Sequence, residues 1–284
     1  MALLIFKKAH RSFSEIERTK IHLNLTIAEC TVTKKMISAL LLLVYVFAGP
    51  NAKARAQDAQ ALVEAAVNYY RGKASTATVD MTVHRPNWER TLTITAWTKG
   101  RKDSVFVIVA PPKDRGNGTL KRGSEMWMYN PKVNRVIKLP PSMMSQAWMG
   151  SDFSNNDLAK SDSIIEDYTN TILTTEIQDE KKVYVIKCVP RPEAPVVWGM
   201  QKLKIREDHI LLSEEFYDED LKLVKAMTGH EIQMLGGKLM PKVWKMQKAD
   251  VKDEYTVLDY RELTFKEDLP DSFFTLTWLR NPRR

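Results

Sequence analysis

The sequence contains little cysteine, with two residues in 284, at positions 30 and 188. Only Cys188 follows the N-terminal segment that we expect to be removed, so the remaining chain can form no internal disulfide. Residues 57–284 are numerous enough to bury a sizeable hydrophobic core within one domain, which must stabilise the fold. Cys188 stands in an alternating strand pattern, and this favours a small core side chain over a reactive thiol.

The sequence also lacks an apolar run long enough to cross a membrane. The longest run, Met36–Ala48, has about 13 residues, whereas a membrane-spanning helix needs about 20. Two lysines precede the run, and the tripeptide A-R-A ending at Ala56 follows it, a pattern typical of a secretory signal peptide. We expect residues 1–56 to be a presequence cleaved near Ala56, with a retained N-terminal anchor as the alternative, and a periplasmic location for the exported domain. Because the polar stretch before the lysines is too long for a signal peptide, we expect the true start at about residues 32–36.

Excess charge is scarce outside this presequence. Nine of the 43 basic and three of the 35 acidic residues lie within residues 1–56, which leaves 34 basic and 32 acidic residues. The formal net charge of +8 for the whole chain therefore falls to +2 over residues 57–284. So small an excess gives no compositional support to nucleic-acid binding, and we expect no nucleic-acid partner.

Motifs for catalysis or metal binding are missing as well. The histidines after the presequence, His84, His209 and His230, lie on or beside different strands or turns, and neither H-E-x-x-H nor G-x-S-x-G occurs. The polar stretch 152–157 lacks the glycine and glutamate that a calcium loop requires, so it is better interpreted as helix capping. We expect no enzyme, no catalytic residue, no metal and no cofactor; an envelope hydrolase is the disfavoured alternative.

Alternating apolar and polar residues dominate the sequence from position 78 onward, which is the period of half-buried strands. Val79 and Met81 begin this alternation, and segments joined by short hairpin-type links continue it to Tyr255–Phe265. The pattern predicts about 10–11 antiparallel strands in a meander. The one long helical pattern, Gln57–Arg71, precedes the strands and ends at Gly72, a candidate C-cap.

The segment 123–158 departs from simple alternation. Its strand, Glu125–Tyr129, is apolar on both faces, with two methionines on one face and Trp127 and Tyr129 on the other. A strand of this kind needs apolar cover on both sides. Pro140-Pro141 then ends the sheet pairing, because proline has no N–H to donate.

The nine residues that follow, Ser142–Gly150, are rich in methionine and hold one tryptophan. Such side chains commonly fill cores. Five methionines within 24 positions nevertheless favour an adaptable binding surface, because methionine repacks around variable shapes. A sheet of this size curls under its own twist and, if it stays open, needs a plug. Ser142–Gly150 and the helix Gln57–Arg71 are the available plugs.

Four motifs carry a family resemblance: K-D-R-G at 113–116, G-S-E-M-W-M-Y-N-P at 123–131, R-V-I-K-L at 135–139 and M-G-S-D-F-S-N-N-D-L at 149–158. The chain resembles the outer-membrane lipoprotein-sorting (LolA-like) family over about residues 65–278, and within it the subgroup with a W-x-Y-x-P … M-G-S-D-F-S … D-L signature. The resemblance implies an open, strongly curved sheet with helices over its concave face, and a periplasmic carrier of acyl chains. In such carriers an arginine on the sheet holds the lid closed, and the motifs do not identify its counterpart here.

We therefore expect a mainly β (α+β) fold in one domain, residues 57–284. This is a strongly curved, incompletely closed antiparallel half-barrel with an N-terminal helix and a mid-chain helical lid on the concave face. The expected cavity-lining and lid residues are Trp97, Phe106, Met126, Trp127, Met128, Tyr129, Met143, Met144, Trp148, Met149 and Phe153. Four basic residues of the loop Pro111–Gly123 are interpreted either as part of a solvated connection or as a rim for lipid phosphates. These four residues are Lys113, Arg115, Lys121 and Arg122.

The function expected from these features is that of a monomeric periplasmic carrier that binds lipid or lipoprotein acyl chains in an apolar cavity. An inner-membrane transporter and an outer-membrane acceptor are the partners that such a carrier would meet. The alternative is a periplasmic sensor or adaptor module of the same fold, acting on a membrane transporter or an envelope-stress protein.

Overall fold

The computed structural model describes residues 50–282, and their side chains from Ala59 onward. The chain from Arg55 onward forms one compact unit, which contains the sheet. Residues 1–49, with the expected start site and the apolar run of the expected signal peptide, lie outside the described residues. Within residues 50–282, every helix is too short or too polar to cross a membrane.

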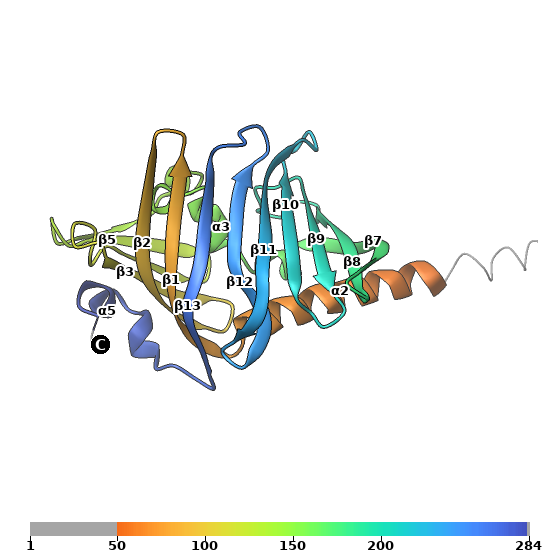
Figure 1. Ribbon diagram of the computed structural model, residues 1–284, viewed down its shortest axis with the longest axis horizontal. Helices are drawn as coiled ribbons and strands as arrows, with labels where there is room; N and C mark the ends of the chain where they lie inside the picture. Colours follow the sequence, from red (N-terminus) through yellow and green to blue (C-terminus); the bar gives the residue numbers. More distant parts are fainter. Residues whose placement is uncertain (1–49, 283–284) are drawn as a thin grey trace, which may run out of the picture. The chain divides into compact units, whose positions relative to one another are not determined.

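One antiparallel sheet of 13 strands dominates this unit. The strands are β1 (Ala74–Arg85), β2 (Trp88–Lys99), β3 (Asp103–Ala110), β4 (Gly118–Arg122), β5 (Glu125–Asn130), β6 (Arg135–Lys138), β7 (Tyr168–Gln178), β8 (Lys181–Pro190), β9 (Met200–Arg206), β10 (Leu211–Tyr217), β11 (Leu223–Leu235), β12 (Lys238–Lys248) and β13 (Tyr255–Lys266). Their order is β6-β5-β4-β3-β2-β1-β13-β12-β11-β10-β9-β8-β7, so β6 and β7 are free edges and the sheet does not close into a barrel (Figure 1). The predicted mainly β, incompletely closed half-barrel is confirmed.

Two details of the strand prediction are wrong. The sheet is not a single meander, because β1 pairs with β13 and joins two meanders, β1–β6 and β7–β13, at its centre. The strand count is 13 rather than about 10–11, partly because β4 lies within the segment expected to be a loop. The C-terminal segment packs closely on β4, since a Cβ at Gly118 would lie 2.7 Å from Cδ1 of Leu279 and 3.2 Å from the carbonyl oxygen of Phe106.

The connection from β6 to β7 links the two free edges of the sheet. It contains η1 (Pro141–Met143), η2 (Trp148–Gly150), α3 (Asn155–Ala159) and α4 (Ser163–Glu166). Its first part, residues 140–160, packs on one face of the sheet and is called the lid below. Trp148, Phe153 and Ala159 of the lid share a buried cluster with Ile94 of β2 and Met246 of β12.

The C-terminal segment covers the opposite face of the first meander. It consists of η3 (Asp271–Phe274) and α5 (Leu276–Arg280), which lie beside β3 in Figure 1. Trp278 and Leu279 pack there against Val105 and Val107 of β3, whereas Ile108, on the other face of that strand, packs in the lid cluster. The strands that are apolar on both faces are therefore covered on both faces, by the lid and by the C-terminal segment.

The helix α2 (Pro50–Arg71) starts before the expected Gln57 and covers the second meander. Its residues Ala59, Val63 and Ala66 pack on strands β7 to β9 together with two isoleucines of α4. The helix ends as expected at Gly72, which has a positive φ of 63° and donates its N–H to the carbonyl of Asn68 at 2.9 Å. This termination places Tyr70 and Arg71 at the interior of the fold.

Candidate functional site

A cavity of about 300 Å³ lies between the sheet and the segments that cover it. Most of its lining is apolar and comes from the two central strands β1 and β13, their neighbours, and the lid. The principal apolar lining residues are Ala77, Val79, Ile94, Ala96, Phe106, Trp148, Phe153, Leu158, Trp198, Phe216, Met227, Met246, Leu258 and Leu263. A second cavity of about 160 Å³ under α2 shares Tyr70, Arg71 and Glu214 with the first.

A row of polar side chains crosses four neighbouring strands at one end of this cavity. Register pairs Ser75 of β1 with Thr98 of β2, Thr98 with Ser104 of β3, and Ser104 with Lys121 of β4. All four residues line the cavity, and the hydroxyls of Ser75 and Thr98 are 2.8 Å apart. On β1 to β3 the next residues on the same face, two positions along, are Ala77, Ala96 and Phe106, so the cavity is amphipathic. We call these four residues the polar row.

Arg71 lies beside the polar row and holds the β2–β3 turn. Its Nη2 donates to the carbonyl of Arg101 at 3.0 Å and to Oγ of Ser104 at 3.4 Å, while Nε donates to the carbonyl of Gly100 at 3.3 Å. Burial lowers the pKa of the Arg71 guanidinium. Lys121 contacts the same turn, because its Nζ donates to the carbonyl of Arg101 at 2.9 Å. The same Nζ lies 3.6 Å from the carboxylate of Asp162.

Glu214 of β10 is a carboxylate on the wall of both cavities. It forms no hydrogen bond or ion pair with any residue in the described part of the chain. Burial, followed by repulsion from Asp157, raises the pKa of Glu214 from its ordinary value of 4.5 to about 7, and Lys225 partly opposes this shift. The cavity therefore contains a group that changes charge near neutral pH.

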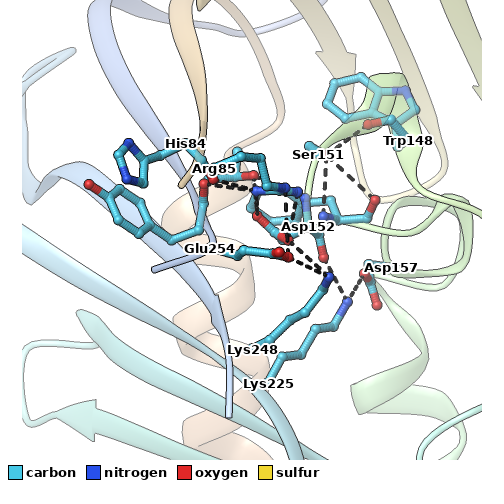
Figure 2. Close-up of polar contacts among 12 residues, drawn as sticks. His84, Arg85, Trp148, Ser151, Asp152, Asp157, Lys225, Lys248 and Glu254 are labelled. Carbon is cyan, nitrogen blue, oxygen red and sulfur yellow. Dashed lines mark hydrogen bonds and ion pairs between the residues drawn. The ribbon is translucent and has the colours of Figure 1, made fainter. Parts of the chain in front are cut away.

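The lid is fastened to the sheet by Asp152, whose carboxylate is fully buried. Figure 2 shows Arg85 of β1 pointing at this carboxylate; its Nη1 and Nη2 donate to the two oxygens at 3.1 and 3.0 Å. Thr256 of β13 donates to the same carboxylate at 2.7 Å and accepts the backbone N–H of Asp152 at 2.9 Å. These contacts form a charged, fully hydrogen-bonded latch between the lid and the two central strands.

Lys225 of β11 adds a second fastening point. Its Nζ donates to the carboxylate of Asp157 in the lid and, at 3.2 Å, to the carbonyl of Asp152 (Figure 2). Asp157 also closes a capping box at the start of α3, since its carboxylate accepts from the N–H of Ser154 and its own N–H donates to the Ser154 hydroxyl. The expectation of helix capping in this stretch is confirmed.

Two further contacts hold the methionine-rich part of the lid. Arg90 of β2 donates from Nη2 to the carbonyl of Met149 at 2.7 Å, and the indole N–H of Trp148 donates to the hydroxyl of Thr119 at 3.0 Å. The sheet arginines that touch the lid are thus Arg85 and Arg90, neither of which any motif identified.

The structure brings only part of the expected cavity set to the cavity wall. Phe106, Trp148 and Phe153 line it, with the rings of Phe106 and Trp148 edge to face at 5.3 Å between centroids. The five methionines of the set pack in or against the buried cluster between lid and sheet, rather than on the cavity wall. Their positions are 126, 128, 143, 144 and 149.

Trp97, Trp127 and Tyr129 are corrected, because the structure places them on the opposite face of the sheet. Trp97 packs edge to face on Trp278, with 4.7 Å between ring centroids. The sequence showed that Glu125–Tyr129 has two apolar faces. Which face meets the lid depends on the C-terminal segment, more than 130 residues away.

The four basic residues of the expected rim do not lie together. Lys113 is exposed, and Arg115 folds back to donate to the carbonyl of Val109 at 2.9 Å. Lys121 points into the cavity and is 1% exposed, whereas Arg122, the next residue of the strand, is exposed near Asp103 at 3.6 Å. Strand alternation within β4 separates these last two, because successive side chains point to opposite faces.

Groups with potential reactivity are buried or scattered. Cys188 is buried in the cluster under α2, and burial raises the pKa of its thiol. His84 lies between Glu89 and Asp253 at the outer end of β1, at 3.2 and 3.1 Å. Within residues 50–282, no group of three or more metal-ligating side chains is arranged to hold an ion.

Sequence reasoning named only Lys121 of the polar row, as part of the expected rim, and missed Arg71, Glu214, Arg85 and Lys225. No short motif contains them. Each is one polar residue within an alternating strand or at a helix end, and their positions meet only through the register of the sheet.

Three solved structures share this fold over most of the chain. A DUF1329 family protein from Desulfovibrio piger is similar at 22% identity, covering 79% of this chain and 99% of its own, with a TM-score of 0.70. A domain from Vibrio parahaemolyticus described as an outer membrane lipoprotein-sorting protein has 20% identity, coverage of 80% and 100%, and a TM-score of 0.69. A LolA superfamily protein from Nitrosomonas europaea has 25% identity, coverage of 78% and 98%, and a TM-score of 0.65. The resemblance to the lipoprotein-sorting (LolA-like) family is confirmed.

Residues 100–281 match the model of a family whose description is "Uncharacterized protein", and the chain belongs to that family. No curated protein matches the sequence.

Proposed function

We propose that this protein is a non-enzymatic periplasmic carrier that binds acyl chains of a lipid or lipoprotein in the cavity beneath the lid. The single observation that carries the proposal is an amphipathic cavity, mostly apolar, between a half-barrel and a lid fastened at discrete polar points. An unfilled apolar cavity lowers the stability of a protein, so its presence favours a binding role over a purely structural one. Ligand sites usually measure about 300–1,000 Å³, so the cavity of about 300 Å³ accepts a small ligand or part of a chain.

The free energy of acyl burial explains the need for a movable lid. Burial of a sixteen-carbon chain stabilises the complex by about 12 kcal/mol, at about 0.8 kcal/mol per methylene. Several chains bound at that strength would never be released. In the closed state, Trp148 and Phe153 line the cavity of about 300 Å³, and a chain too long for that space displaces them. Lid opening and chain binding then nearly cancel in free energy, and transfer becomes reversible.

The proposal is tested by native mass spectrometry and organic extraction of protein purified from its own envelope. We expect lipid or lipoprotein acyl chains bound at substoichiometric to equimolar amounts, and displaced by added detergent. Protein that emerges empty, and that binds no acyl chain on incubation with lipid vesicles, would contradict the carrier function and favour a sensor or adaptor role.

A further inference from the structure

The polar end of the cavity is lined by a cation, Arg71, that has no carboxylate within ion-pair distance in the described part of the chain. Asp162 acts on the pKa of Arg71 only through longer-range attraction. Arg71 satisfies Nε and Nη2 on the β2–β3 turn, but its Nη1 has no hydrogen-bond partner among residues 50–282. No carboxylate in that part of the chain forms an ion pair with the guanidinium. The neighbouring cations differ in this respect, because Lys121 lies 3.6 Å from Asp162 and Arg101 lies 3.8 Å from Glu64.

A guanidinium remains charged in proteins, and a buried charge without a partner is unfavourable. A purely structural clamp on the turn would account for Nε and Nη2, yet Lys121 already holds the same turn through the carbonyl of Arg101. A clamping role for Arg71 would also leave unexplained why the hydroxyls of Ser75, Thr98 and Ser104 face the cavity beside it. Hydroxyls and a guanidinium together make up a donor set suited to an anion.

The apolar part of the cavity begins directly next to this donor set. One paired position further along, Ala77 of β1 faces Ala96 of β2, and Ala96 faces Phe106 of β3. The following pair is Val79 and Ile94. The lining thus changes from donors to hydrocarbon within a few ångströms, as an amphiphile does between its head group and its chain.

Glu214 is the acidic residue that shares both cavities with Arg71. The cation that acts on its pKa is Lys225, not Arg71. Glu214 sits on β10, in the other meander, with β13, β12 and β11 between that strand and β1, the nearest strand of the polar row. The two ends of the cavity are therefore electrostatically distinct.

We propose that Arg71 and the polar row bind the anionic head group, a carboxylate or a phosphate, of a single-chain amphiphile whose chain lies along the apolar lining. This inference rests on the acyl-carrying function proposed above and narrows its ligand class. Arg71 supplies the charge-assisted hydrogen bonds, and the hydroxyls of Ser75, Thr98 and Ser104 complete the set of donors. A cargo whose polar end is neutral would leave the guanidinium unpaired.

The test compares three ligands with the same sixteen-carbon chain at pH 8, by isothermal titration with the protein purified from its own envelope and freed of lipid. Palmitate presents a carboxylate, palmitoyl-lysophosphatidic acid presents a phosphate, and methyl palmitate is the neutral control. We expect at least one anionic ligand to bind at least about 10-fold more tightly than methyl palmitate, as a hydrogen-bonded charge would give. The tighter anionic ligand identifies the head-group chemistry.

Arg71→Met is expected to abolish this preference while the affinity for methyl palmitate is unchanged. Arg122→Met, an exposed arginine on the other face of β4, is the matched control and should keep the preference. Arg71→Lys, which retains the charge, serves if the methionine variant fails to fold, and should keep part of the preference. Equal binding of all three ligands by the unmodified protein, or a preference that survives Arg71→Met, would overturn the inference while leaving the carrier function standing. Binding of none of the three would overturn both.

Discussion

Glu214 makes the stability of the protein depend on pH in an unusual direction. Its pKa in the folded state is about 7, above the ordinary value of 4.5, so the folded state binds the proton more tightly than the unfolded state. The contribution of Glu214 to the free energy of unfolding is therefore fully present below about pH 4.5, and it is lost as the pH rises through 7. At 1.36 kcal/mol per pKa unit, the loss amounts to roughly 3 kcal/mol.

Glu214→Gln should remove this penalty, because a glutamine is neutral at every pH. We expect the difference in the free energy of unfolding, variant minus unmodified protein, to rise by roughly 3 kcal/mol between pH 4 and pH 8, measured by urea denaturation. Glu215→Gln is the matched control, since Glu215 lies on the other face of β10 and pairs with Lys202 at 2.6 Å. A difference that is flat with pH for Glu214→Gln would show that the carboxylate is solvated.

The lid is fastened by a small number of buried polar contacts, and this makes its opening separable from global unfolding. Asp152→Asn removes the carboxylate that accepts from both Nη atoms of Arg85 and leaves only Glu254, at 3.8 Å from Nε. Loss of one member of a buried ion pair costs about 3–5 kcal/mol. If the lid opens, Arg85 becomes exposed to water, and the free energy of unfolding of the remaining sheet falls by much less than this amount. We expect the backbone amide at position 152 to lose its protection from hydrogen exchange in this variant, because the bond from that amide to Thr256 reports docking of the lid.

Asp253→Asn serves as the control for the latch, since Asp253 is an exposed carboxylate that pairs with His84 at 3.1 Å. It should leave lid exchange unchanged. If Asp152→Asn instead speeds exchange equally in the lid and in the central strands, the lid is an integral part of the core and does not open by itself.

Alternation in the sequence was sufficient to predict most strands and both faces of Glu125–Tyr129. It could not reveal β4, on which Leu279, from the far end of the chain, packs closely at Gly118. The latch could not be predicted from the sequence either, because Asp152 contacts Arg85 and Thr256, which are 67 and 104 residues away in the chain. Local periodicity reports that a side chain is buried, whereas its partner is set by the order of the strands.

The arrangement of the whole molecule follows from one pairing, that of β1 with β13. This pairing brings the two meanders together, so that the polar row of β1 to β4 and Glu214 of β10 line one cavity. It also directs the C-terminal segment onto the face opposite the lid. The cavity and the C-terminal segment thus lie on opposite faces of one sheet. A buried tryptophan packs on each face, Trp148 from the lid and Trp278 from the C-terminal segment.

This division predicts different outcomes for the same substitution on the two faces. Trp148→Phe and Trp278→Phe both shrink a buried indole, and each should lower the free energy of unfolding by about 1–3 kcal/mol. Only Trp148→Phe weakens the closed lid, which competes with the acyl chain, so it alone should raise acyl-chain affinity, by about tenfold for each 1.4 kcal/mol of closure lost. Titration with a fluorescent acyl probe, alongside urea denaturation, measures both quantities. An equal change in affinity for the two variants, or a change for Trp278→Phe alone, would mean that the lid does not compete with the cargo for the hollow.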